Sequence, residues 1–304
     1  MRKLTLILRL ARLHFLIPGF MLYVLGYLLA ILSGIEPDLP KFVFGYLIFG
    51  AAHLSVSFSN DYFDRNSDRN SVKTAFSGGS KVLVEYPELE SIALKLAVVL
   101  LCSSIIANAL FTLFYGYTVW FFVFGLMGGL LTWFYTAPPL KLAYRGLGEL
   151  STMLAVGLLM PGMGYFVAAN TIGPLFQLFI LPLSFYGLFF IITVELPDVE
   201  CDKISHKTNL LVKWGRTAGK VVAVLATFTG TTLMTALLFV GAANKQIDVM
   251  PFAVFSFLPL VASVSGLVFQ ASTRTVLVRQ VMVNMASMIL YLFLIDASLF
   301  YQYI

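Results

Sequence analysis

The chain has 304 residues, of which 59% are hydrophobic and only 12% are charged. Because soluble domains carry about 25% charged residues, this composition excludes an ordinary soluble protein, a disordered chain and a disulfide scaffold. The net charge of +5 would suggest nucleic acid as the partner of a soluble protein. In a membrane protein it indicates basic loops on the cytoplasmic side, so we expect a lipid bilayer and no nucleic acid among the partners.

Nine apolar segments follow one another along the chain, separated by short polar turns. A spanning helix needs ~20 apolar residues, so each segment is expected to cross a membrane. The first has a basic start like a signal peptide, but no small-residue cleavage site follows it, so we interpret it as a retained helix. We expect one all-α domain over residues 1–304. The segments are 13–33, 40–60, 90–113, 117–136, 147–168, 174–195, 219–242, 249–270 and 281–303.

The basic residues are distributed unevenly between the two sides that nine spans define. Every lysine and arginine except Lys41 and Lys245 falls on the side of the N-terminus. The positive-inside rule then places the N-terminus and the loops after the second, fourth, sixth and eighth spans in the cytoplasm. The expected location is the cell membrane, crossed several times.

An acidic cluster ends the second apolar segment, in the run SNDYFDRNSDR (59–69). Asn60, Asp64 and Asp68 are spaced by four residues, which places them on one face of a helix. Like charges at this spacing repel each other. A cation bound between them would remove the conflict.

A second acidic cluster ends the sixth segment, in the run ELPDVECD (195–202). Glu195, Asp198 and Asp202 lie at offsets of zero, three and seven, again on one helical face. Pro197 is expected to kink or end the apolar helix at this point. Both clusters therefore lie at helix ends on the predicted cytoplasmic side.

The two clusters offer oxygen ligands, while the histidines are scattered along the chain. Such ligands suit Mg²⁺, which usually binds one or two carboxylates together with substrate phosphates, whereas zinc prefers histidine or cysteine. Nearby lysine and arginine would pair with the phosphates. Two facing clusters therefore predict a diphosphate held through Mg²⁺, although each cluster alone is also compatible with a solvated loop.

A third polar segment, YTAPPLKLAYRG (135–146), follows the fourth apolar segment on the same predicted side. Its tandem prolines break the helix. Tyr135 and Tyr144 then offer hydroxyls, and Lys141 and Arg145 offer cations. These groups suit a diphosphate, and they equally fit a plain basic loop that obeys the positive-inside rule.

Together, these motifs resemble those of the UbiA superfamily of membrane prenyltransferases. The resemblance rests on NDYFDRNSD after the second segment, YTAPPLKLAYRG after the fourth and DVECDKISHKT after the sixth. It implies a ring of nine transmembrane helices around a central cavity, with a cytoplasmic cap formed by the loops after helices 2, 4 and 6. The implied reaction transfers an isoprenyl chain from its diphosphate to an acceptor, usually an aromatic one.

The resemblance also implies roles for individual residues. One Mg²⁺ would be bound by Asn60, Asp64 and Asp68, and a second by Asp198 and Asp202. Glu195 would be a further metal ligand or a base near the acceptor. The residues implied to contact the diphosphate or to stabilise its departure are Arg12, Lys73, Tyr135, Lys141, Arg145 and Lys207. Catalytic roles are implied for Asp64, Asp68, Asp198, Asp202, Lys141 and Arg145.

Three stretches are most similar to the 1,4-dihydroxy-2-naphthoate branch of the superfamily, which makes menaquinone precursors. They are SGGSKVLVE (77–85), YRGLGEL (144–150) and ELPDVECDK (195–203). The same chemistry on 4-hydroxybenzoate, haem or geranylgeranylglyceryl phosphate stays open, and the donor is expected to be geranylgeranyl diphosphate or longer. An Mg²⁺-coupled membrane carrier also stays open, although carriers tend to place their charges near the bilayer midplane.

The implied chemistry requires a dry pocket, because water would trap the allylic carbocation that forms as the diphosphate leaves. Aromatic faces within the bundle would line this pocket and stabilise the cation. His53 and Asp296 are polar residues inside the second and ninth segments. Each either hydrogen-bonds a neighbouring helix or touches the acceptor.

Overall fold

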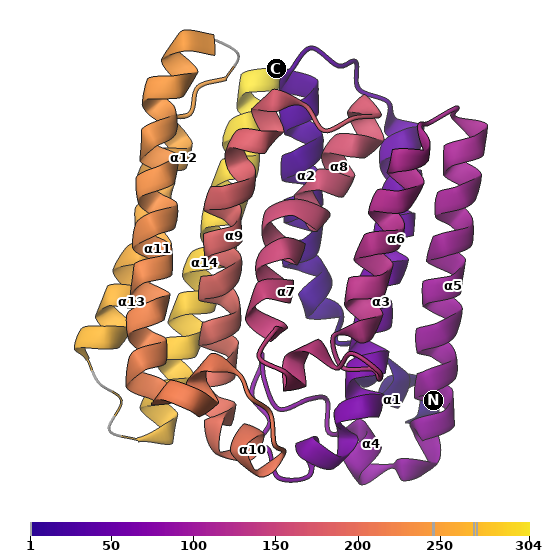
Figure 1. The fold of residues 1–304 in the computed structure, drawn as a ribbon, viewed down its shortest axis with the longest axis vertical. Coiled ribbons are helices and arrows are strands. Elements are labelled where there is room, and N and C mark those ends of the chain that lie inside the picture. Colours follow the sequence, from indigo (N-terminus) through magenta and orange to yellow (C-terminus); the bar gives the residue numbers. More distant parts are fainter. Residues whose placement is uncertain (1, 245–246, 270, 272) are drawn as a thin grey trace.

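The computed structural model describes residues 2–244, 247–269, 271 and 273–304. Over these residues every regular element is a helix, which confirms the all-α prediction. The long helices stand side by side with nearly parallel axes, and the N- and C-termini lie at opposite ends of the bundle (Figure 1).

Most of the helices are connected by short loops, whereas the loop between α3 and α4 runs over residues 69–81. The element η4 is a π-helical turn between α7 and α8. In chain order they are α1 (Arg2–Ala11), η1 (Leu13–Phe15), α2 (Leu16–Leu32), α3 (Leu39–Asp68), α4 (Val82–Glu85), η2 (Pro87–Leu89), α5 (Glu90–Phe114), α6 (Val119–Phe134), η3 (Leu142–Tyr144), α7 (Gly148–Leu154), η4 (Ala155–Leu159), α8 (Met160–Ala169), α9 (Pro174–Glu195), η5 (Leu196–Asp198), α10 (Val199–Ile204), α11 (Leu210–Asn244), α12 (Met250–Phe255), α13 (Phe257–Val268) and α14 (Arg274–Tyr303).

Within the described residues, eight helical stretches are long and apolar enough to cross a membrane. Each of them overlaps one of the predicted segments. The remaining predicted segment, 117–136, is α6, whose 16 residues rise about 24 Å. Since this is less than the ~30 Å of a hydrocarbon core, a crossing by α6 and the total of nine spans stay predictions.

Several helices extend beyond the apolar segments that hydropathy predicted. Helix α3 continues to Asp68 and α14 begins at Arg274, whereas the predicted segments ended at residue 60 and began at residue 281. The hydropathy pattern stops at the first charged residues, but the backbone hydrogen bonds of the helix continue through them. The predicted end of the eighth segment at residue 270 and the basic residue Lys245 lie outside the described residues.

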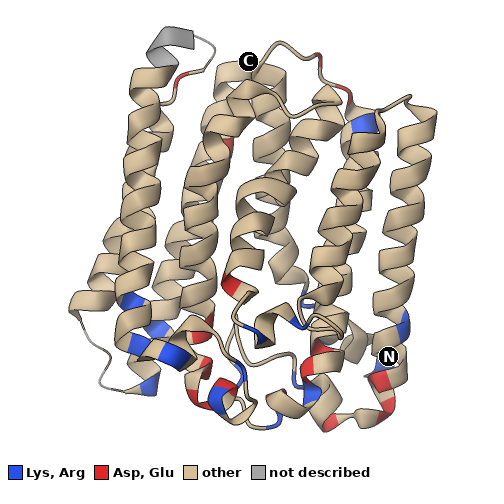
Figure 2. Ribbon diagram, viewed as in Figure 1, with Lys and Arg blue, Asp and Glu red and all other residues tan. Residues whose placement is uncertain are grey.

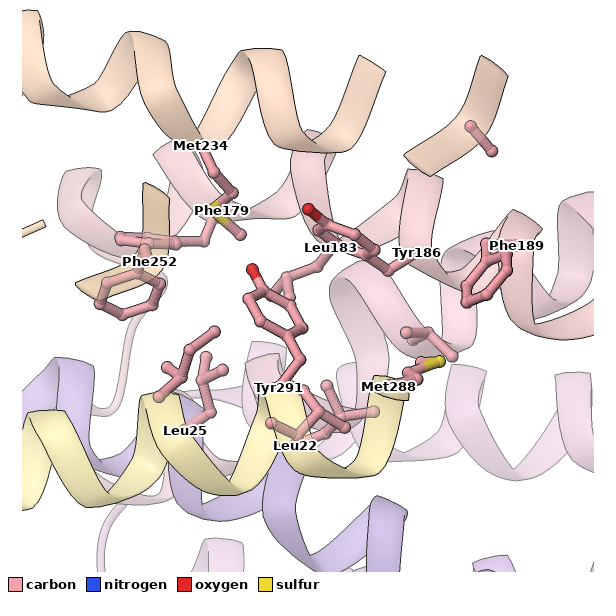
Figure 3. Packing of buried hydrophobic residues seen from close by; sticks show 14 of the residues in the cluster. Leu22, Leu25, Phe179, Leu183, Tyr186, Phe189, Met234, Phe252, Met288 and Tyr291 are labelled. Carbon is pink, nitrogen blue, oxygen red and sulfur yellow. The ribbon is translucent and has the colours of Figure 1, made fainter. Parts of the chain in front are cut away.

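The largest apolar core lies between α2, α9, α11 and α14, and Figure 3 shows part of it. Tyr186 of α9 and Tyr291 of α14 face each other there, with ring centroids 4.9 Å apart. The hydroxyl oxygens of Tyr186 and Thr231 are 3.2 Å apart, so α11 is hydrogen-bonded to α9 inside this core. These contacts hold the four helices together as one side of the bundle.

Helices α2 and α8 approach each other backbone to backbone. A Cβ atom on Gly26 would lie 1.7 Å from the carbonyl oxygen of Pro161, and one on Gly164 would lie 1.9 Å from that of Tyr23. Small residues permit such close approach between helices in membranes. A larger side chain at either glycine would therefore force the two helices apart.

Charged residues gather at the end of the bundle that holds the N-terminus, α4 and α10 (Figure 2). We refer to this end as the charged end. The loop between α3 and α4 and the loop that contains η3 also lie there (Figure 1). Both acidic clusters and the third polar segment are therefore at the same end of the molecule.

Candidate functional site

The first acidic cluster lies on the last turns of α3, where the helix continues to Asp68. The Thr136 hydroxyl donates a 2.9 Å hydrogen bond to Asn60 Oδ1, and the Tyr144 hydroxyl donates a 2.6 Å hydrogen bond to Asp64 Oδ1. Both donors belong to the loop after α6. This loop therefore orients the side chains of the first cluster, a contact between segments that are about 80 residues apart in the sequence.

The loop between α3 and α4 folds back over Asp68. Gly78 and Gly79 have φ angles of 79° and 66°, which residues with a side chain rarely adopt. A Cβ atom on Gly79 would lie 2.0 Å from Asp68 Oδ2. The Lys81 ammonium donates to the Asp68 carbonyl oxygen and, at 2.8 Å, to Ser71 Oγ. The loop is thus fitted closely around the end of the acidic helix.

Asp61 is an acidic residue of the same motif that was not among the predicted site residues. Its side chain is only 3% exposed, and it accepts hydrogen bonds from the backbone N–H and the hydroxyl of Ser80. Asp61 therefore anchors the loop to α3. Its spacing from Asn60 and Asp64 takes it off their common helix face, and no local spacing connects it with Ser80, 19 residues later in the chain.

The second acidic cluster spans a break in the helix, as Pro197 predicted. Helix α9 ends at Glu195, η5 covers Leu196–Asp198, and α10 begins at Val199. The Asn209 amide donates a 2.8 Å hydrogen bond to Asp202 Oδ2. In contrast, Glu195 Oε2 and Asp198 Oδ1 are buried and have no hydrogen-bond partner among the described residues.

Lys207 joins the two clusters. Its Nζ lies 3.7 Å from Asp64 Oδ2 and 3.2 Å from Asp202 Oδ1, and 5.3 Å from the centre of the Tyr144 ring. Burial alone would lower the pKa of Lys207, but Asp64 and Asp202 outweigh it and raise the pKa well above its usual value. The ammonium therefore stays charged at neutral pH, and the two clusters face each other across it.

The tyrosine in this arrangement stays protonated. Burial, followed by the charge of the neighbouring Asp64 carboxylate, raises the pKa of Tyr144 above its usual value. The hydroxyl can therefore donate to Asp64 throughout the pH range in which proteins are assayed. The sequence predicts this hydroxyl as part of the site but not its partner, because the pairing depends on how the loop after α6 folds.

The donor set fits Mg²⁺ if a substrate supplies the remaining ligands. Among the described residues, no three histidine, cysteine or acidic side chains converge closely enough to hold an ion by themselves. Mg²⁺ commonly binds only one or two carboxylates and takes phosphate oxygens and water for the rest. The partnerless oxygens of Glu195 and Asp198 are acceptors that a bound cation would satisfy, since a buried acceptor without a partner costs free energy.

The predicted cations do not all reach the acidic clusters. Arg145 Nη2 donates a 2.9 Å hydrogen bond to the Pro139 carbonyl of its own loop, and Lys141 Nζ lies 5.5 Å from the centre of the Tyr144 ring. Lys73 Nζ donates a 3.1 Å hydrogen bond to the Ser80 carbonyl. All three residues are exposed, and these contacts are with carbonyl oxygens and a ring, not with the carboxylates of the clusters.

A central cavity of about 320 Å³ lies inside the bundle and extends away from the charged end. Arg12, Asn60 and Tyr135 line it at the charged end, and Phe76 of the loop between α3 and α4 lines it from the same side. Most of the remaining wall is apolar and comes from α2, α3, α6, α7, η4, α8 and α9. The cavity is therefore polar at one end and suited to a hydrocarbon over the rest.

Two of the residues whose roles the sequence left open lie at different places. His53 lines the central cavity, whereas Asp296 lies on α14 toward the opposite end of the bundle and does not line it. Asp296 Oδ1 is buried without a hydrogen-bond partner among the described residues. Arg12 Nε is likewise buried and without a partner, and Arg12 also lines a second hollow of about 330 Å³ beside Lys73.

The chain is similar to known proteins over most of its length. Residues 19–288 match the UbiA prenyltransferase family. The chain belongs to this family. It is accordingly a prenyltransferase that crosses the membrane several times, as the resemblance of its motifs predicted.

Individual relatives are distant in sequence but similar over nearly their whole length. The 1,4-dihydroxy-2-naphthoate octaprenyltransferase of Bacillus subtilis (strain 168) is 24% identical over 270 residues, which are 86% of this chain and 81% of that protein. A UbiA homologue from Archaeoglobus fulgidus bound to GPP and Mg²⁺ is 18% identical, with a TM-score of 0.63 over 95% of this chain and 99% of that chain. The apo structure of a UbiA homologue from Aeropyrum pernix K1 is 14% identical, with a TM-score of 0.70 over 94% and 98%.

Proposed function

We propose that this protein transfers an isoprenyl chain from a prenyl diphosphate, geranylgeranyl or longer, to an aromatic acceptor in an Mg²⁺-dependent reaction. The observation that carries the proposal is the meeting of two acidic clusters, through Lys207, at the polar end of an apolar cavity. The leading acceptor is 1,4-dihydroxy-2-naphthoate, which the relative from Bacillus subtilis (strain 168) supports through its name.

The two clusters are proposed to divide the metal ions between them. Asn60, Asp64 and Asp68 would hold one Mg²⁺, and Asp198 and Asp202, with Glu195 beside them, would hold a second. When bound, Mg²⁺ supplies positive charge that stabilises the leaving diphosphate. The buried, partnerless oxygens of Glu195 and Asp198 support this assignment for the second cluster.

Basic side chains and one tyrosine hydroxyl of the protein would complete the diphosphate site. Arg12 and Tyr135 line the polar end of the cavity, and Lys207 lies between the clusters, so these three would contact the diphosphate from inside. Lys73, Lys141 and Arg145 are exposed around them and would add long-range attraction as the anion arrives. Positive groups fixed around the developing charge favour the departure of the diphosphate.

The cavity is proposed to hold the hydrocarbon chain and the acceptor ring. The allylic C–O bond breaks and its electron pair leaves with the diphosphate. The electron-rich ring then forms a C–C bond to the allylic carbon and loses the proton from the attacked position. Because most of the wall is apolar, water is kept from the carbocation, and aromatic side chains such as Phe15, Phe76 and Phe190 offer ring faces to its charge.

The orientation in the membrane follows from the basic residues. Their concentration at the charged end (Figure 2) supports a cytoplasmic location for the acidic clusters and the N-terminus, because basic loops stay in the cytoplasm. The water-soluble diphosphate would therefore be taken from the cytoplasmic side and released there. The hydrocarbon substrates and products would remain in the bilayer of the cell membrane.

The direct test is a transfer assay with purified protein in detergent, radiolabelled geranylgeranyl diphosphate, Mg²⁺ and parallel acceptors. The acceptors are 1,4-dihydroxy-2-naphthoate, 4-hydroxybenzoate and geranylgeranylglyceryl phosphate. We expect labelled product with the naphthoate, lost with EDTA and in Asp64→Ala and Asp198→Ala. Product with another acceptor alone would replace the naphthoate. Mg²⁺ transport into vesicles without any transfer would support the carrier instead.

A further inference from the structure

The polar row that begins with the acidic cluster of α3 continues into the central cavity. His53 lies seven residues before Asn60 on the same helix, which places it about 10 Å deeper along the helix axis. Residues 53, 57, 60 and 64 share one face of the helix because they are spaced by three or four residues. His53 and Ser57 both line the cavity. This face of α3 therefore carries polar groups deeper in the bundle than the proposed diphosphate site.

The imidazole ring of His53 fits into the space that a glycine leaves on the neighbouring helix. A Cβ atom on Gly19 of α2 would lie 2.4 Å from Cε1 and 2.5 Å from Nδ1 of His53. The ring is also packed against Phe49, with centroids 5.5 Å apart. Gly19 therefore leaves the space that the ring fills, and the ring edge formed by Nδ1 and Cε1 faces α2.

One nitrogen of this ring has no hydrogen-bond partner in the part of the chain that the structure describes. Nδ1 is buried against α2 without a hydrogen-bond partner among the described residues. A histidine that served only to tie two helices together would use this nitrogen for a bond to the neighbouring backbone. With no acceptor beside Nδ1, we assign the proton of the neutral ring to Nε2, which leaves an N–H donor for a molecule in the cavity.

We propose that His53 determines which acceptor the enzyme uses, by donating a hydrogen bond from Nε2 to a ring hydroxyl oxygen of the aromatic acceptor. This inference rests on the proposed function. A prenyl chain is a hydrocarbon and offers no acceptor atom, whereas an oxygenated aromatic ring does. The acceptor ring would react next to the diphosphate, near Asn60 and Tyr135. Its oxygen on the side away from the diphosphate can then point deeper into the cavity, toward His53.

The experiment compares acceptors that differ by one hydroxyl in enzymes that differ at one residue. The variants are His53→Leu, which removes the donor at similar volume, and His53→Gln, whose amide can reach the position of Nε2. Ile48→Val is the matched control, since it alters the wall of the same cavity without removing a polar atom. Each enzyme is assayed for kcat/KM with 1,4-dihydroxy-2-naphthoate and with the two analogues that lack one ring hydroxyl. Binding of radiolabelled geranylgeranyl diphosphate with Mg²⁺ is measured separately.

We expect His53→Leu to lower kcat/KM for the full acceptor about tenfold or more, with diphosphate binding unchanged, because one hydrogen bond to a buried donor is lost. The analogue that lacks the hydroxyl bound by His53 should have a lower kcat/KM than the full acceptor in the wild type and in Ile48→Val. In His53→Leu, the removal of this hydroxyl should cause no comparable further loss. The analogues' lower intrinsic reactivity is common to all enzymes and cancels in this comparison. His53→Gln should recover most of the loss.

Two results would overturn the inference. If the wild type transfers the chain but His53→Leu discriminates between the acceptors as the wild type does, His53 has no part in acceptor choice. This includes the case in which the variant changes only the preferred length of the prenyl donor. If the wild type transfers the chain to no aromatic acceptor, the proposed function fails, and this inference fails with it.

Discussion

The two acidic clusters carry similar side chains but differ in how firmly the protein holds them. The first lies on an uninterrupted helix, and Asn60 and Asp64 each accept a hydrogen bond from the loop after α6. The second crosses the break at Pro197, and Glu195 and Asp198 each keep one buried oxygen without a hydrogen-bond partner among the described residues. Asn60 and Asp64 are therefore oriented before any ligand arrives, whereas Glu195 and Asp198 would gain their missing partners only when a cation binds.

The largest effect is expected at the second cluster. Asp198→Asn should lower prenyl transfer about 100-fold or more, because charge stabilisation by a metal ion is worth several kcal/mol. Mg²⁺ with a diphosphate should raise the Tm of the wild type but raise that of the variant much less, and EDTA should abolish the rise. Activity assays and thermal unfolding in detergent check both. Equal Mg²⁺ stabilisation of the variant would contradict the proposed role of Asp198.

The contact that joins the clusters should matter most when no metal is present. Lys207→Met leaves Asp64 and Asp202 facing each other, and we expect a loss of up to about 3 kcal/mol in the free energy of unfolding, since the ion pairs are largely buried. Mg²⁺ with inorganic diphosphate should recover part of this loss. Lys207→Arg, which keeps the charge, serves as control. A Met variant as stable as the wild type without Mg²⁺ would show that the clusters do not depend on this ammonium.

A smaller effect is expected from the hydroxyl that orients the first cluster. Tyr144→Phe removes the hydrogen bond to Asp64 and should weaken the apparent Mg²⁺ affinity about tenfold, as is typical for groups that orient metal ligands. Tyr117→Phe, which removes a hydroxyl bonded to the Val167 carbonyl, is the matched control and should leave Mg²⁺ affinity unchanged. The measurement is the Mg²⁺ dependence of transfer, and equal affinities in both variants would argue against preorganisation by Tyr144.

The smallest effect is expected from a substitution in the loop that covers Asp68. Gly79 and Gly116 have nearly equal φ angles of 66° and 64°, but only a Cβ on Gly79 would meet Asp68, while one on Gly116 would meet nothing within 4 Å. Gly79→Ala and Gly116→Ala should therefore both cost about 1 kcal/mol of stability from backbone strain. Only Gly79→Ala should also lower transfer, by a few-fold. Equal activities would mean that the loop tolerates a displaced Asp68.

Helical periodicity explains why the first cluster could be predicted from the sequence. Spacings of four residues keep Asn60, Asp64 and Asp68 on one helix face, and α3 does continue to Asp68. Pro197 likewise predicted the end of α9. Both inferences depend only on local backbone geometry, which the sequence encodes directly.

The contacts between the clusters could not be predicted in this way. Lys207 lies beyond the end of α10 and follows His206, which has a φ of 56°, so no helical spacing determines the direction of its side chain. The partnership of Asp61 with Ser80 and that of Tyr144 with Asp64 depend on how two loops fold onto α3. The lengths of the helices were also underestimated, because hydropathy ignores the charged turns that carry the site.

The shortness of α6 has a consequence for the surrounding membrane. A helix of 16 residues is about 6 Å shorter than a typical hydrocarbon core, and lipids adapt to such hydrophobic mismatch by thinning locally. Helix α6 contributes Gly128, Leu131 and Thr132 to the wall of the central cavity, so lipid that thins beside a membrane-spanning α6 would lie against that wall. The acyl-chain length of the host bilayer would then be a physical variable of this enzyme, acting at the wall next to its hydrocarbon substrate.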